Sequence, residues 1–176
     1  MSIIVVILIL FITALSLLLR SRRRHKWIVK EKEKFSIPQG KITYTDLNRP
    51  TEPLFSAGLG LVGKPDYIVE INNKYIPVEV KSGKARRPYG NHVLQLATYC
   101  LLIEEIYNQT VPFGILIYSG GQQFTIPFVA VLKEEVMKTL DEMRMQLASK
   151  SVERNHNVSA KCKFCPFRRF CNQKIV

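Results

Sequence analysis

The beginning of the chain carries no charge. Residues 1–19 contain no Asp, Glu, Lys or Arg, although the 176-residue chain has 26 basic and 14 acidic side chains. Only Thr13 and Ser16 interrupt the apolar run of residues 3–19. At about 1.5 Å per helical residue, this run just spans a hydrocarbon core of about 30 Å. We therefore expect a single transmembrane helix in residues 1–19, the alternative being a helix buried in a hydrophobic core.

Basic residues follow this run and do not precede it. Residues 20–34 contain eight basic and two acidic side chains. A signal peptide has its positive charges before the apolar run, so cleavage is not expected. The positive-inside rule places the N-terminus outside and the rest of the chain in the cytoplasm. Residues 20–40 then form a basic juxtamembrane linker that meets anionic lipid.

The composition of the remaining chain indicates a folded, basic domain. Apolar residues make up 47% of the chain, which excludes a wholly disordered protein. The formal net charge is +12, and residues 35–176 account for half of it. Within that part, four cations gather in residues 81–87, where a membrane does not explain them. Such a basic patch suits a nucleic acid.

Two hairpins and two helices are expected after residue 40. Residues 41–46 alternate like a short strand, and residues 50–60, with two prolines and two glycines, resemble a loop. The hairpins comprise residues 67–71 with 74–81, joined by Asn72-Asn73, and 113–118 with 123–131. Helical periodicity covers residues 91–108 and 133–150. This order predicts an α/β (α+β) domain around a mixed sheet of about five strands.

The first hairpin brings two acids together. A two-residue turn at Asn72-Asn73 places Asp66 opposite Glu79. Like charges in this position destabilise a sheet, and a divalent cation would reverse that effect. Lys81 lies on the same strand face as Glu79. The three side chains suit Mg²⁺ or Mn²⁺ beside an ammonium group that orients water or stabilises charge on a phosphate. The alternative is a Pro-Asp turn followed by surface strand residues.

Three motifs in this order carry a resemblance to a known family. They are residues 63–66 (Gly-Lys-Pro-Asp), 79–81 (Glu-Val-Lys) and the pair Gln95 and Tyr99. They resemble the GxPD, ExK and QxxxY elements of the PD-(D/E)XK nuclease superfamily. The spacing of Cys162, Cys165 and Cys171 is similar to that of its RecB-like exonucleases, which include the CRISPR-associated Cas-four family. The resemblance implies a restriction-endonuclease-like mixed sheet flanked by helices.

The resemblance also implies roles for individual residues. Asp66, Glu79 and the backbone carbonyl of Val80 would bind the metal, and Lys81 would position the attacking water or stabilise the transition state. Gln95 and Tyr99 would assist from the helix, because residues four apart share one helix face. The alternative for Tyr99 is simple packing.

One family element is missing. Members usually carry a metal-binding histidine before the GxPD strand, but only His25 precedes Asp66, and we expect it to be solvated. Glu31, Glu33 and Glu52 are weak substitutes, and His92 is expected at the surface of a helix N-terminus. The alternative hypothesis is therefore a catalytically impaired nucleic-acid-binding or membrane scaffold protein that keeps the fold and a structural metal site.

Three cysteines near the C-terminus suggest a second metal site. Cytoplasmic thiols stay reduced, so a disulfide framework is not expected for Cys162, Cys165 and Cys171. A [4Fe-4S] cluster with an outside fourth ligand, a Zn²⁺ site completed by His156, and three unligated thiols all remain open. Cys100 has apolar helical neighbours and is expected as a small buried residue.

The sequence thus predicts a membrane-anchored, Mg²⁺- or Mn²⁺-dependent exonuclease acting on single-stranded DNA ends. Its parts are an anchor (1–19), a linker (20–40), a nuclease core (41–150) and a cysteine-rich tail (151–176). Cations expected to contact DNA lie near the site and among tail phenylalanines: Lys84, Arg86, Arg87, Arg168 and Arg169. The expected partners are DNA, membrane lipid, and a helicase or CRISPR adaptation proteins that supply the DNA.

Overall fold

The computed structural model of the chain describes residues 6, 9–20, 40–46, 52–150 and 152–175. These residues form two compact units, Met1–Val136 and Met137–Val176, which are considered separately. The predicted linker, including His25, Glu31 and Glu33, falls almost wholly outside the described residues.

The transmembrane prediction is wrong. Among the residues that the structure describes, no helix has both the length and the apolar character needed to span a bilayer. The N-terminal helix is described over residues 9–20. The predicted single-pass topology, lipid contact and cytoplasmic location of the domain are therefore not supported.

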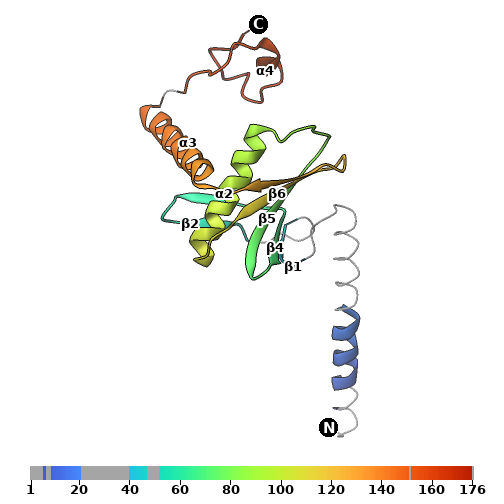
Figure 1. Ribbon diagram of the computed structural model, residues 1–176. Coiled ribbons are helices and arrows are strands. Elements are labelled where there is room, and N and C mark those ends of the chain that lie inside the picture. The colour runs from blue at the N-terminus through green and yellow to red at the C-terminus, as the bar shows by residue number, and fades with distance from the viewer. Residues whose placement is uncertain (1–5, 7–8, 21–39, 47–51, 151, 176) are drawn as a thin grey trace. The chain divides into compact units, whose positions relative to one another are not determined.

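A five-stranded mixed sheet is the centre of the first unit, as predicted (Figure 1). Its strands, in spatial order, are β1 (Lys41–Thr45), β4 (Tyr67–Ile71), β5 (Lys74–Lys81), β6 (Phe113–Tyr118) and β7 (Gln123–Pro127). Only β5 and β6 run parallel, and the other neighbours are antiparallel. With its helices, this sheet fits a restriction-endonuclease-like fold.

The β4–β5 hairpin has the predicted turn and register. Asn72 and Asn73 have φ values of 50° and 59°, the positive values that a two-residue turn of type I′ requires. The ladder runs from Ile71 opposite Lys74 to Tyr67 opposite Val78 and ends there. Asp66 and Glu79 are the next opposed positions beyond this end of the ladder.

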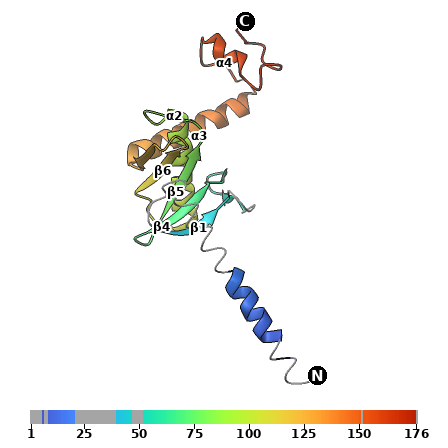
Figure 2. The ribbon, with the colours of Figure 1, turned by 90° about the vertical axis from the view of Figure 1, so that its right-hand side faces the viewer.

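Helix α2 (Gly90–Tyr107) packs on one face of the sheet, as Figures 1 and 2 show. Strand side chains alternate between two buried clusters, because successive residues point to opposite faces. Ile76 and Val78 of β5 belong to the cluster on the face away from α2. Glu79 therefore points toward the helix, and so does Lys81. Cys100 is 1% exposed in the α2 core, which confirms the prediction for this residue.

Two regions differ from the prediction by more than one residue. Strands β2 (Leu54–Ser56) and β3 (Leu61–Gly63) form a small antiparallel sheet where a loop was expected. Strand β7 ends at Pro127, and α3 (Ala130–Ser149) begins earlier than predicted. The apolar residues 129–131 resemble a strand end, but the amides of Leu132 and Lys133 bond to the carbonyl of Val129 and start the helix.

The second unit contains the end of α3 and a short helix, α4 (Ser159–Lys163). Its two ends are tied together by polar contacts. The backbone amide and the Nε of Arg154 donate to Gln173, at 2.7 and 2.8 Å. The Sγ of Cys162 accepts the amide of Ile175 at 3.4 Å.

Candidate active site

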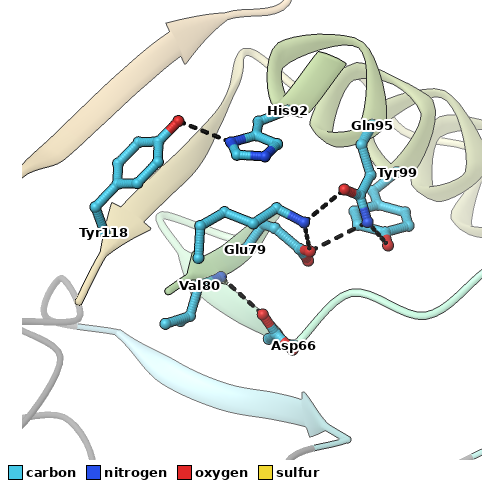
Figure 3. A network of polar contacts seen from close by, with 8 residues as sticks. Asp66, Glu79, Val80, His92, Gln95, Tyr99 and Tyr118 are labelled. Carbon is cyan, nitrogen blue, oxygen red and sulfur yellow. Dashed lines mark hydrogen bonds and ion pairs between the residues drawn. The ribbon is translucent and has the colours of Figure 1, made fainter. Parts of the chain in front are cut away.

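The C-terminal end of β5 and the first half of α2 together form a polar network (Figure 3). The ammonium group of Lys81 donates to Oε1 of Glu79 at 2.7 Å and to Oε1 of Gln95 at 2.6 Å. Glu79 and Lys81 share a strand face, and the helix carries Gln95 onto that face. The amide of Gln95, which is 14 residues from the lysine and 16 from the acid along the chain, is thereby joined to them in one site.

Gln95 is the centre of this network. Its Nε2 donates to Oε1 of Glu79 at 3.1 Å and to the hydroxyl of Tyr99 at 2.8 Å. The amide orientation follows from its neighbours, because a lysine only donates and a carboxylate only accepts. The one-turn spacing of Gln95 and Tyr99 thus has the predicted effect of placing them on one helix face.

Asp66 reaches the same strand end from the residue before β4. Its Oδ2 accepts the backbone N–H of Val80 at 2.7 Å. This amide is available because β4 stops pairing with β5 at Val78. The bond directs the carboxylate toward the stretch that contains Glu79, and the charge of Asp66 acts on Glu79.

Burial controls the protonation of these side chains. Burial raises the pKa of Glu79, which is 6% exposed; the hydrogen bond from Lys81 opposes this and the charge of Asp66 adds to it. Burial also raises the pKa of Asp66, against the lowering effect of the Val80 amide. Burial raises the pKa of Tyr99 to about 12, so its hydroxyl keeps its proton at neutral pH. The two acids therefore lie where an unneutralised negative charge is unfavourable.

One acceptor of the site has no partner. Oε2 of Glu79 is buried and receives no hydrogen bond of ordinary geometry from the described residues, although the backbone N–H of Asp66 lies near this carboxylate and lowers its pKa. A buried carboxylate oxygen left without a donor is costly, and hard cations such as Mg²⁺ and Mn²⁺ prefer oxygen ligands. Glu79 and Asp66 therefore fit a divalent cation. Within the described ranges no set of three or more His, Cys, Asp or Glu side chains forms a metal site, so further ligands would come from backbone carbonyls or water.

Two residues next to the network were not predicted to belong there. Nδ1 of His92 lies 2.8 Å from the hydroxyl of Tyr118, which also accepts the amide of Tyr89 at 3.3 Å. Burial and the charge of Lys81 lower the pKa of His92. A lowered pKa favours the neutral imidazole, and its tautomer sets which of the two groups donates. Tyr118 pairs with Lys81 across the parallel strands, a proximity that only the sheet order reveals.

The remaining predicted residues are distributed over both units. Lys84, Arg86 and Arg87 are exposed on the segment that follows Lys81. Arg168 and Arg169 are exposed in the second unit. Glu52 is also exposed, and its backbone carbonyl accepts the hydroxyl of Tyr44 at 3.2 Å.

The cysteines do not form the expected metal site in the part of the chain that is described. Cys162 is buried, while Cys165 and Cys171 are half-buried, and all three are free thiols. They make no group that could hold a metal there, with or without a histidine. Nδ1 of His156 instead accepts the amide of Val158 at 3.3 Å.

A mixed sheet that carries Asp66 and the Glu79-x-Lys81 pair at one strand end, with a glutamine from the adjacent helix, has the architecture of restriction-endonuclease-like nucleases. The family model described as "PD-(D/E)XK nuclease superfamily" matches residues 12–172. The chain belongs to this superfamily.

Relatives within the superfamily are distant. A CRISPR-associated exonuclease Cas4/endonuclease Cas1 fusion of Leptospira interrogans is 27% identical over 121 residues, covering 63% of this chain and 22% of the relative. A CRISPR-associated exonuclease Cas4 of Francisella tularensis subsp. novicida is 25% identical over 114 residues, covering 65% of this chain and 57% of the relative. The match thus spans only part of either relative. The crystal structure of SSO0001 covers 92% of this chain and is itself covered to 72%, with 21% identity and a TM-score of 0.49.

Proposed function

We propose that this protein is a divalent-metal-dependent deoxyribonuclease that hydrolyses phosphodiester bonds. The observation that supports this most strongly is the contact of Lys81 with both Glu79 and Gln95, beside an unpaired Glu79 oxygen. The ion pair of Lys81 with Glu79 is not needed for the stability of the fold, because buried ion pairs add little to stability. The unpaired oxygen of Glu79 destabilises the fold. A site that binds a cation and a phosphate explains both features.

Each side chain has a role in this proposal. Glu79 and Asp66 would hold Mg²⁺ or Mn²⁺, with the Val80 carbonyl as a further ligand. Such a cation, when bound, activates water and stabilises charge on the phosphate. Lys81 has three N–H donors and uses two on Glu79 and Gln95. The third would orient the attacking water or bind a non-bridging phosphate oxygen.

The helix residues act through Lys81 and Glu79. Gln95 restricts the lysine to one position, and Tyr99 restricts the amide. As water attacks, its oxygen bonds to phosphorus, the ester bond opposite breaks, and the departing oxygen gains a proton. A rigid arrangement of donors lowers the reorganisation needed in this step.

Action on DNA ends is supported by the two relatives, which bear the name CRISPR-associated exonuclease. We extend that reaction to this chain, with single strands preferred and a helicase or CRISPR adaptation protein as the source of substrate. The exposed cations Lys84, Arg86 and Arg87 would meet the phosphate backbone beside Lys81. Arg168 and Arg169 would contribute from residues 151–176, outside a nuclease core formed by residues 41–150.

The second candidate is a protein that binds nucleic acid without cleaving it. It is favoured by the finding that the described residues provide only two carboxylates at the site and no third side-chain ligand. Both candidates predict DNA binding, but only the first predicts turnover.

The test is the degradation of end-labelled single-stranded DNA by the full chain with Mn²⁺ or Mg²⁺, compared with Asp66→Ala and Lys81→Ala. We expect wild-type cleavage and a loss of about 10²–10⁴-fold in each variant, the range for groups that act in the chemical step. Equal residual cleavage signals from all three proteins would exclude the nuclease hypothesis and favour binding without cleavage.

A further inference from the structure

A cavity lies beyond the catalytic network. It is open to solvent, has a volume of about 590 Å³, and is lined by Lys84, Ala85, Arg86, Gln122, Gln123 and Phe124. This volume is within the range of about 300–1,000 Å³ that is typical of sites for small ligands. Its walls come from two segments: the loop after β5 and the turn between β6 and β7.

Backbone hydrogen bonds hold these two segments together. The amide of Ser119 donates to the carbonyl of Lys81 at 2.8 Å, and that of Gly120 donates to Gly83 at 3.0 Å. The amide of Gly83 donates in return to the hydroxyl of Ser119 at 2.8 Å. A methyl group at Gly120 would overlap the side chain of Lys84, so glycine permits this close approach. The cavity is therefore formed before any ligand binds.

The cavity and the catalytic lysine are on the same face of the sheet. Ala85 is buried with Leu96 of α2 and Tyr118 of β6, and Phe124 packs against this cluster. The ring of Phe124 meets the ring of Tyr118 edge-on at 5.9 Å. Tyr118 is the strand neighbour of Lys81. A strand of nucleic acid with one phosphate at Lys81 would thus pass the cavity with a neighbouring nucleotide.

The lining offers three kinds of contact. Lys84 and Arg86 are exposed and form no ion pair with any residue in the described ranges. Oε1 of Gln122 is buried and accepts no hydrogen bond from the described residues. Ala85 and Phe124 give the cavity an apolar wall. A free phosphate would use only the cations, whereas a nucleotide also has base N–H donors and a ring.

We infer that this cavity is a subsite for the nucleotide next to the one being cleaved. Its phosphate contacts Arg86 and Lys84, and its base or sugar lies against Phe124. The inference rests on the proposed function for the identity of the substrate. It adds a fixed contact to one particular phosphate, which a diffuse basic surface does not provide.

The test measures binding to the full chain in EDTA, so that no cleavage is required. The probes are fluorescent single-stranded pentanucleotides in which one linkage at a time is an uncharged methylphosphonate. We expect wild-type affinity to fall by about tenfold at one linkage, the effect of losing one charge-assisted contact. In Arg86→Gln the methylphosphonate at that linkage should no longer lower the affinity, because the arginine that contacts this phosphate is already missing.

Arg87→Gln is the matched control. Arg87 is adjacent, exposed and of the same charge, but it does not line the cavity. This variant should lose the general electrostatic attraction and keep the drop at the sensitive linkage. The subsite is excluded if all linkages are equivalent in the wild type, or if Arg86→Gln and Arg87→Gln respond alike. Because binding is the readout, an inactive protein with the predicted Arg86 response would disprove the nuclease and keep the subsite.

Discussion

Glu79 is an acid in a place that disfavours its charge. It is 6% exposed, and burial raises its pKa despite the hydrogen bond from Lys81. The pKa of Glu79 is thus higher in the folded protein than in the unfolded chain. Ionisation of Glu79 at neutral pH therefore destabilises the folded state. This loss of folding stability is complete above the pKa of Glu79 in the folded protein. It disappears as the pH falls through that value toward the pKa of an ordinary glutamate. A side chain kept in such a position indicates a functional requirement.

We therefore expect Glu79→Gln to be more stable than the wild type at pH 7 in EDTA. Glutamine has the shape of the protonated acid and carries no charge. The difference should disappear when the pH falls below the usual range of a glutamate, because the wild type is then protonated in both states. Urea unfolding at the two pH values measures this.

Glu105→Gln, the same change at an exposed position, should leave the stability nearly unchanged. A Glu79→Gln protein that is less stable than the wild type at pH 7 would show that the ion pair with Lys81 outweighs the burial.

At the scale of the elements, the site depends on how closely α2 approaches β3 and the start of β4. Gly63, the last residue of β3, lies against the helix three residues before Asp66. A Cβ at this position would be 2.7 Å from Cδ1 of Leu102 and 2.9 Å from Cε1 of Tyr99. The glycine of the GxPD motif is thus needed for packing, since its φ is not positive.

Gly63→Ala should move α2 and the side chains that it carries. Overpacking of this kind destabilises by about 1–3 kcal/mol. Displacement of Tyr99 should also lower the cleavage rate at temperatures where the variant remains folded, because Tyr99 positions Gln95. Urea unfolding and single-turnover cleavage measure the two effects.

Gly90→Ala is the control for this substitution. A Cβ at Gly90 meets no atom within 4 Å, and its φ is not positive. It should leave the rate unchanged and keep or slightly raise the stability, because alanine favours the helix. A Gly63→Ala protein that matches Gly90→Ala in both measurements would contradict the packing argument.

At the scale of the whole molecule, a ligand that binds only the folded state stabilises it by mass action. The two acids come together only when β4, β5 and α2 have assembled. The unfolded chain therefore has no comparable site, and binding energy becomes folding energy.

Mn²⁺ should accordingly raise the unfolding temperature of the full chain at pH 7. The gain is about 2.7 kcal/mol when the free ion is at 100 times its Kd. Differential scanning fluorimetry with and without EDTA measures the shift. Asp66→Asn should lose most of it, whereas a shift equal to that of the wild type would place the ion elsewhere in the chain.

Local patterns were sufficient for much of this fold. The tolerance of asparagine for positive φ specified the β4–β5 turn, and the strand bounds 67–71, 74–81 and 113–118 followed from alternation and β-rich composition. The one-turn spacing of Gln95 and Tyr99 likewise put them on one face. Such features depend on residues that are close together in the chain, so they can be predicted from the sequence.

Other features depend on segments that meet only after folding. The hydrophobicity of residues 1–19 suggested a membrane span, but no helix in the described part of the chain is long and apolar enough to form one. The contact of Asp66 with the Val80 amide, the pairing of Tyr118 with Lys81 and the cavity at Lys84 arise from the order of β4, β5 and β6 in the sheet. Residue types and local periodicity establish which chemical groups are present, but their distances are set by packing between strands and helix that are remote in sequence.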